Sequence, residues 1–284
     1  MGENLALPSA NTRLLAVLGH PVGHSLSPTI HNAALRAQSV DAVYVAFDVL
    51  PDRLATAIDG LRALNVWGAN LTIPHKELAV GLVDELDLTA QRVGAINTIV
   101  NREGHLMGHN TDIAGFLGAL RSVRKEGAAG ARCLVAGAGG AARAVVAALM
   151  AGGAEAVFVY NRTPERAETL CRAASTWGKG VCEAVAATSL SDVVRTSDVI
   201  VNATSVGLAD SVKKSSIPVD SLDGHHVVVD LVYGRRDTAL VSQAVLRGAI
   251  AIGGLEMLLK QAAASYELWT GLKAPLDVMR DSVA

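Results

Sequence analysis

The sequence has few aromatic residues, few cysteines and almost no net charge. Aromatic side chains make up 4% of its 284 residues, and the formal net charge at pH 7 is −2. A balance so close to neutrality gives no reason to expect nucleic acid or an anionic membrane surface as a partner. The longest apolar stretch, around 133–151, is interrupted by three glycines and by Arg143. Such a stretch is too broken to span a membrane.

The cysteines, Cys133, Cys171 and Cys182, are odd in number and form no C-x-x-C pair. This spacing predicts free thiols in a reducing compartment. The N-terminus has no basic segment followed by an apolar run, so we expect no secretory signal. The sequence therefore indicates a soluble, cytoplasmic protein.

Small and aliphatic residues are abundant: half of the sequence is hydrophobic and 27 residues are glycine. Apolar runs of strand length alternate with helical patterns, which is typical of βαβ units around a mainly parallel sheet. In the first half we expect strands over 14–19, 43–49 and 67–72, and helices over 27–38, 51–64 and 75–84. A hairpin is expected within 96–109 and a helix over 111–125. After a Gly/Ala-rich break we expect strands over 132–137, 156–161, 198–203 and 226–232, followed by a helical C-terminal segment.

The second half contains a nucleotide-binding pattern. Gly137, Gly139 and Ala142 have the spacing G-x-G-x-x-A between an expected strand and an expected helix. In this pattern the first glycine allows a tight turn and the second lets the backbone approach a pyrophosphate. The helix N-terminus offers free N–H groups to phosphate. We therefore predict two domains, an N-terminal α/β substrate domain over 1–112 and a C-terminal Rossmann domain over 113–254.

The end of the next strand indicates which nucleotide is bound. NAD-binding relatives of this pattern carry an acidic residue there, which holds the ribose 2′-hydroxyl. This sequence has Asn161 and Arg162 instead, with Arg166 four residues further on. Two guanidinium groups suit a 2′-phosphate. The sequence therefore predicts NADP rather than NAD.

Polar side chains gather at the expected element ends of the first domain. They are Ser25 and Ser27, Asn70, Thr72 and Lys76, and Asn97, Asn110 and Asp112. In open α/β sheets ligands bind outside the carboxyl ends of the strands, so these groups are expected to converge. Hydroxyls, amides, one lysine and one aspartate suit a small molecule rich in hydroxyl groups. A lysine in this set can exchange a proton with an alcohol or a ketone.

Taken in order, these motifs resemble those of the shikimate dehydrogenases. The pattern runs H-S-L-S-P, G-x-N-x-T-x-P-x-K, G-A-x-N-T, N-T-D, G-A-G-G-A-A-R-A, N-R-T-x-x-R, N-A-T-S, D-L-x-Y and G-L-x-M-L-x-x-Q, over about residues 14–275. The resemblance implies reversible NADP-linked interconversion of 3-dehydroshikimate and shikimate, a step toward chorismate and the aromatic amino acids. It also implies that the C-terminal helices, 255–284, return to the first domain. The sequence departs from the family pattern in 208–220, at 234–236 and at Gly253.

The resemblance implies a role for each matching position. Lys76 would be the acid/base group and Asp112 its partner. Ser25 and Ser27 would hold the substrate carboxylate together with Tyr233. The ring hydroxyls would be held by Thr72, Asn97, Asp112 and Gln261. The NADP site would be lined by Gly137, Ala138, Gly139, Gly140, Ala141, Asn161, Arg162, Thr163, Arg166, Leu231 and Gly254.

Two other functions are weighed against this one. A quinate or broader quinate/shikimate dehydrogenase usually uses NAD, with an acidic residue where Arg162 stands here. A non-catalytic module that senses NADP or shikimate would be expected to lack Lys76 or Asp112, and both are present. The motifs do not determine the oligomeric state, and a homodimer is one of the alternatives that they allow.

A metal site is not expected. The histidines His20, His24, His31 and His75 have no carboxylate at ligand-like spacing. Among these four, His20 and His24 are closest in sequence, and they flank a proline and a glycine that disfavour a helix.

Overall fold

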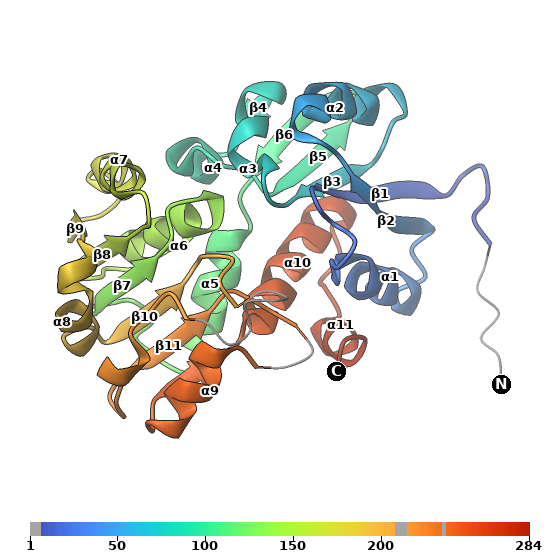
Figure 1. Cartoon of the computed structure of the whole chain (residues 1–284). Coiled ribbons are helices and arrows are strands. Elements are labelled where there is room, and N and C mark those ends of the chain that lie inside the picture. Colours follow the sequence, from blue (N-terminus) through green and yellow to red (C-terminus); the bar gives the residue numbers. More distant parts are fainter. Residues whose placement is uncertain (1–6, 208–214, 235–236) are drawn as a thin grey trace. The chain divides into compact units, whose positions relative to one another are not determined.

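The computed structural model describes residues 7–207, 215–234 and 237–284, coloured along the chain in Figure 1. Part of the atypical segment 208–220, and two of the positions 234–236, therefore lie outside the described residues. The chain divides into two compact units. Unit 1 extends to Thr111 and includes Ala262–Ala284, and unit 2 is Asp112–Gln261. The second crossing lies inside a helix, further along the chain than the expected limit at 254.

Unit 1 is built around a six-stranded mixed sheet in the order β2-β1-β3-β5-β6-β4. Its strands are β1 Arg13–Gly19, β2 Ala42–Asp48, β3 Gly68–Leu71, β4 Glu85–Leu86, β5 Thr98–Arg102 and β6 His105–His109. Its helices are α1 Ser27–Ala37, α2 Leu54–Ala63, α3 His75–Leu78, α4 Leu88–Val93, the last part of α10 Gly254–Thr270 and α11 Leu276–Asp281. β1 pairs in parallel with β2 and β3, and β5 runs antiparallel to β3 and β6.

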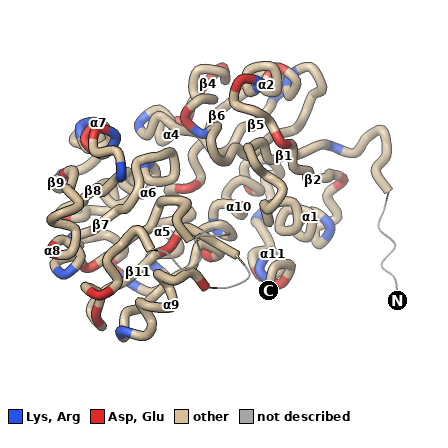
Figure 2. Tube along the Cα trace, viewed as in Figure 1, with Lys and Arg blue, Asp and Glu red and all other residues tan. Residues whose placement is uncertain are grey.

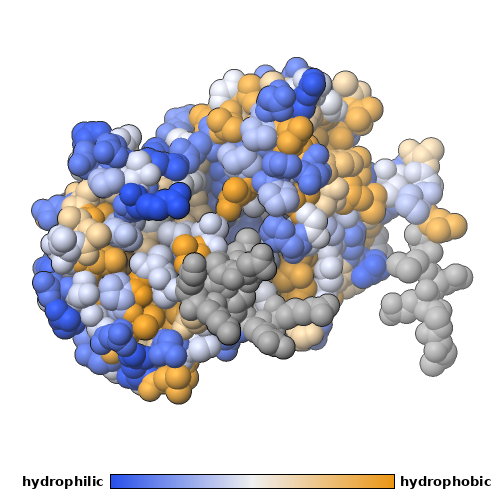
Figure 3. Space-filling view, viewed as in Figure 1, coloured by the Kyte–Doolittle hydropathy of each residue, from blue (hydrophilic) through white to orange (hydrophobic). Residues whose placement is uncertain are grey.

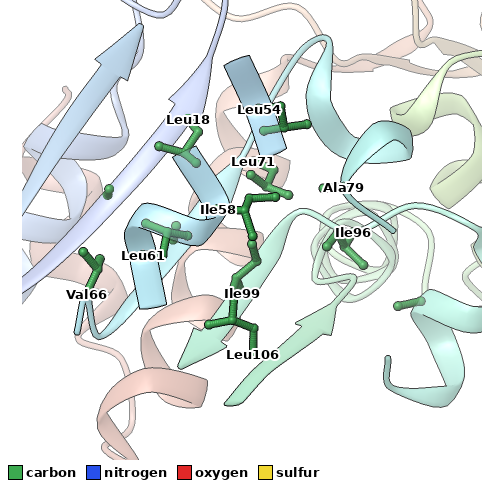
Figure 4. Packing of buried hydrophobic residues seen from close by; sticks show 13 residues of the cluster. Leu18, Leu54, Ile58, Leu61, Val66, Leu71, Ala79, Ile96, Ile99 and Leu106 are labelled. Atoms are coloured by element: carbon green, nitrogen blue, oxygen red, sulfur yellow. The ribbon is translucent and has the colours of Figure 1, made fainter. Parts of the chain in front are cut away.

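The core of unit 1 lies where α2 packs on the sheet (Figure 4). Leu54, Ile58 and Leu61 are buried and recur at the spacing of one helix face. They pack in one cluster with Leu71 and Ile99 from the central strands. Burying each such side chain stabilises the fold by about 1.5–3 kcal/mol. This packing fixes the strands whose ends carry the polar residues described below.

Unit 2 is built around a six-stranded parallel sheet in the order β12-β11-β10-β7-β8-β9. Its strands are β7 Arg132–Ala136, β8 Ala156–Tyr160, β9 Val181–Ala184, β10 Val199–Asn202, β11 Val227–Asp230 and β12 Ile250–Ile252. Its helices are α5 Asp112–Arg121, α6 Gly140–Ala151, α7 Pro164–Ala174, α8 Leu190–Arg195, α9 Ala239–Leu246 and the first part of α10 Gly254–Thr270. The central strands β7, β10 and β11 are almost entirely buried, as expected for a sheet covered on both faces.

The predicted fold class is confirmed: two α/β units, the second with the strand order of a doubly wound sheet. One predicted helix was wrong. In place of one helix over 75–84, the structure has the four-residue α3 and a 3₁₀ turn over Ala79–Leu82, and the strand β4 follows at Glu85. Gly81 lies in that turn, and glycine weakens a helix interior.

Hydrophilic and hydrophobic residues are interspersed on the face shown in Figure 3. Within the described part of the chain, no helix combines the length and the apolar character needed to cross a membrane.

Candidate functional site

The register of the unit 1 sheet places four loops at one edge. β1 and β3 are parallel neighbours, with Leu18 opposite Leu71, so the loops that follow them emerge at the same edge. β5 begins beside the end of β3 because it runs antiparallel to it, and the pair Thr98–His109 brings the end of β6 to the same place. The predicted substrate residues of unit 1 lie in these loops or in the first turn of the helix that follows, as Ser27 does in α1 and Lys76 in α3.

The loops after β1 and β3 are joined directly. The His20 N–H donates to the carbonyl of Ile73 at 2.9 Å. A Cβ at Gly19 would lie 2.3 Å from Cγ2 of Thr72, so only glycine permits this approach. The half-buried Ser25 precedes α1, and its Oγ accepts a hydrogen bond from the N–H of Ser27 at 3.3 Å. The Ser25 hydroxyl proton thus remains free to be donated elsewhere, and Ser27 is buried in the first turn of α1.

Lys76 lies in the first turn of α3 and is half-buried. Its neighbour His75 is buried, with Nε2 bonded to the carbonyl of Val49 at 2.8 Å. The carbonyl of Lys76 itself accepts from the Ile96 N–H at 2.8 Å. Hydrogen bonds therefore attach the segment that carries the Lys76 amine to the loop after β2, through Val49, and to the loop before β5, through Ile96.

Asn97 is held by a buried network of hydroxyl and amide groups. Its Oδ1 accepts from the N–H of Thr111 at 2.8 Å, and its Nδ2 donates to Thr111 Oγ1 at 2.9 Å. Ser265, from the C-terminal segment, is hydrogen-bonded to Thr111 Oγ1 at 3.1 Å and to Asn70 Nδ2 at 3.1 Å. The sequence motifs named Asn97 and Asn70 but missed Ser265, because no local pattern marks a serine in a helix as a partner of distant loops.

The remaining predicted substrate residues belong to unit 2. Asp112 follows Thr111 directly in the chain, begins α5 and is 3% exposed. Gln261 is buried, and its Nε2 donates to the Leu258 carbonyl of its own helix at 3.0 Å. Tyr233 is half-buried after β11.

The turn between β7 and α6 has the geometry expected for a phosphate loop. Gly137 has φ of 120°, and a Cβ there would lie 2.7 Å from the carbonyl oxygen of Ala203. Nothing lies within 4 Å of a Cβ at Gly139, so space is open above that residue. No side chain caps α6, whose first N–H groups are left for another acceptor.

Predicted NADP residues from two further segments meet at the same edge of the unit 2 sheet. Leu231 follows β11, and Gly254 begins α10. A Cβ at Gly254 would lie 2.4 Å from the Leu231 carbonyl oxygen, so a larger residue would separate the two segments. The tight turn, the open space at Gly139 and the uncapped helix fit a dinucleotide.

The arginines predicted to select NADP are exposed at the beginning of α7. Arg162 and Arg166 flank Thr163, which precedes the helix without capping it through its side chain. The amide of Asn161 donates to the Thr163 carbonyl at 2.9 Å and holds the turn. Both basic and acidic residues lie along this helix (Figure 2).

Among the described residues, Asp223, His225 and His226 are close enough together to suggest a metal site. His226, however, uses both ring nitrogens within the protein. Its Nδ1 accepts from the Asp223 N–H at 2.9 Å, and its Nε2 is bonded to the Val194 carbonyl at 2.9 Å. This arrangement fits a loop fixed by hydrogen bonds better than a metal centre.

Three family models match successive parts of the chain. They are the shikimate dehydrogenase substrate binding domain at 17–99, shikimate / quinate 5-dehydrogenase at 120–235 and the shikimate 5′-dehydrogenase C-terminal domain at 254–284. Shikimate dehydrogenase (NADP(+)) of Moorella thermoacetica is 45% identical over 95% of this chain and 92% of its own length.

Solved structures of shikimate dehydrogenases also resemble the fold. One, in complex with NADP+, has a TM-score of 0.90 at 36% identity and covers 99% of this chain and 98% of its own. Another, from Thermus thermophilus in complex with NADP(H) and shikimate, has a TM-score of 0.85 at 38% identity and covers 95% and 98%. Because these relatives match it over at least 95% of its residues, this chain belongs to the shikimate dehydrogenase family.

Proposed function

We propose that this chain catalyses the reversible NADPH-dependent reduction of 3-dehydroshikimate to shikimate, with Lys76 as the acid/base group. The observation that carries the proposal is the convergence of the Ser25, Thr72, Lys76 and Asn97 loops at one edge of the unit 1 sheet. Membership of the family supplies the reaction. The proposal keeps the expected cytoplasmic location and small-molecule substrates.

In the reduction, Lys76 would donate a proton to the carbonyl oxygen, and in the oxidation it would accept the hydroxyl proton. NADP, when bound, supplies or accepts the hydride. Asp112 would hold the lysine amine and a ring hydroxyl. Ser25 and Ser27 would donate hydrogen bonds to the substrate carboxylate beside the N-terminus of α1, whose dipole favours an anion. Both amide atoms of Asn97 are bonded to Thr111, so this residue would also fix the backbone that leads to Asp112.

Lys76→Ala should lower kcat by about 10²–10⁴, the usual contribution of a general acid or base. KM for shikimate and the affinity for NADP should stay within a few-fold, because binding groups remain. Steady-state assays with shikimate and NADP, paired with NADP titrations, measure both. Glu77→Ala, an exposed change in the same turn, is the matched control. A Lys76→Ala enzyme with more than a tenth of wild-type kcat would exclude Lys76 from this role.

The substrate is tested separately by comparing NADPH oxidation with 3-dehydroshikimate and with 3-dehydroquinate. We expect kcat/KM to favour 3-dehydroshikimate strongly. Comparable values for the two ketones would indicate the broader quinate/shikimate activity, and no turnover of either would favour a sensing module.

A further inference from the structure

Two of the three cysteines lie together in unit 2. Cys171 is on α7 and Cys182 is on β9, one of the two edge strands of the parallel sheet. Both line one open surface hollow of about 450 Å³, next to Glu168 and Arg172. Figure 1 shows the helix beside this edge of the sheet.

The two thiols interact directly, and their hydrogen bond makes them unequal. It is the main cause that lowers the pKa of Cys171 and the main cause that raises the pKa of Cys182. The thiol of Cys182 therefore stabilises a thiolate on Cys171, which forms more readily than in an isolated thiol. Cys133 differs: it is fully buried, and burial raises the pKa of its thiol to about 12.

We propose that Cys171 and Cys182 are a dithiol modification site, at which a low-molecular-weight disulfide converts the pair to an internal disulfide. The Cys171 thiolate attacks one sulfur of the small disulfide, forms a mixed disulfide and releases one small thiolate. Cys182 then loses its proton to solvent and attacks the Cys171 sulfur, releasing the second small thiolate. The protein loses two protons and two electrons, and the small disulfide takes them up to become two thiols.

The placement of the pair suits both steps. The hollow leaves room for a small disulfide beside Cys171, which is itself 7% exposed. Cys182 is partly exposed on the edge strand, so it can rotate toward its partner. Bridging requires the two sulfurs to approach to about 2.05 Å. Both cysteines already line the same hollow, so the required movement is local.

The experiment exposes the native full-length protein to oxidised glutathione and follows its intact mass. Wild type should lose two hydrogens and retain no glutathione. Cys182→Ser should instead stop at one stable glutathione adduct on Cys171, because the second step has no nucleophile. Cys133→Ser, the matched control, should behave as wild type.

Tryptic mapping then identifies the bridge, because each cysteine falls in its own peptide. Cys171 lies in 167–172, Cys182 in 180–195 and Cys133 in 133–143. We expect a cross-link between the first two peptides. Stable adducts on wild type without a cross-link, a bridge that includes Cys133, or thiols that stay unreacted until the protein is denatured would each overturn the proposal.

Discussion

The most unusual single residue is His31, which is completely buried in α1. Its ring stacks on Tyr44, with centroids 4.4 Å apart and planes at 11°, and neither ring nitrogen has a hydrogen-bond partner among the described residues. Burial lowers the pKa of this histidine from 6.5 to about 3. The folded protein therefore keeps His31 neutral well below the pH at which an exposed histidine binds a proton.

This burial predicts a specific loss of stability in acid. An unfolded chain binds a proton at His31 below about pH 6.5, and the folded chain does so only near pH 3. The contribution of His31 to the free energy of unfolding is therefore fully present above pH 6.5. Below that pH it is lost at about 1.4 kcal/mol per pH unit. His31→Phe, which keeps a ring on Tyr44, should reduce the slope of unfolding free energy against pH between 6 and 4 by that amount.

Urea unfolding at a series of pH values measures the slope. His24→Phe, which replaces an exposed histidine, is the control and should leave it unchanged. An equal slope in wild type and His31→Phe would show that His31 is protonated in the folded state.

Cofactor choice is a second property at the scale of single residues. Arg162 and Arg166 are each expected to contact the 2′-phosphate, and a hydrogen bond to a charged group contributes about 1.5–3 kcal/mol. Replacing both by glutamine should raise KM for NADP by about 10²–10⁴, allowing for non-additivity. Turnover with NAD should barely change, because no contact with NAD is removed.

The measurement is the ratio of kcat/KM for NADP to that for NAD. Arg172→Gln changes an exposed arginine of the same helix that is paired with Glu168 at 3.7 Å, and it should leave the ratio unaltered. The assignment fails if the double variant also leaves it unaltered.

At the scale of elements, two glycines in the turn between β7 and α6 are expected to have different roles: Gly137 in stability and Gly139 in cofactor binding. Gly137→Ala places a side chain at a positive φ and against the Ala203 carbonyl, so it should lower the unfolding free energy by about 1–3 kcal/mol or more, the cost of a strained backbone. Gly139→Ala meets no protein atom at negative φ and should leave stability within about 0.5 kcal/mol. Its methyl group would instead occupy the space expected for the pyrophosphate, and NADP affinity should fall.

Chemical denaturation and NADP titration of the two variants distinguish these effects. Tight NADP binding by Gly139→Ala would show that the cofactor does not approach this turn.

Much of the order of strands and helices along the chain could be predicted from the sequence, because buried parallel strands such as β7 and β11 are continuous apolar runs. The edge strand β9 was not predicted, since three of its four residues are exposed and no apolar pattern marks it. The same limit applies to the site. The motifs name Asn97 and Lys76, but pairings across the sheet such as Asn97 with Thr111 depend on register, which a single sequence does not reveal.

At the scale of the whole molecule, the chain enters unit 2 after Thr111 and returns to unit 1 after Gln261, so unit 1 is completed only by the last residues. Trp269 shows what this return contributes. It is 1% exposed, and its Nε1 donates to the Ile99 carbonyl of β5 at 2.9 Å. Gly68 of β3 lies so close that a Cβ there would be 2.2 Å from the indole nitrogen. The C-terminal segment is therefore part of the unit 1 core.

Trp269→Ala should lower the stability of unit 1 by about 3–5 kcal/mol, the usual effect of removing a buried large aromatic side chain. Trp269→Phe retains a ring and loses mainly the hydrogen bond to Ile99, so about 0.5–1.5 kcal/mol is expected. Amide hydrogen exchange resolves the two units: exchange should accelerate in β1 and β3 and stay slow in β7 and β8. Shikimate binding should weaken when unit 1 is destabilised, because the residues proposed to bind the carboxylate and hydroxyls of shikimate lie near the ends of those strands. If β7 and β8 lost protection to the same extent, the two units would unfold as one, and the effect of Trp269 would not be confined to unit 1.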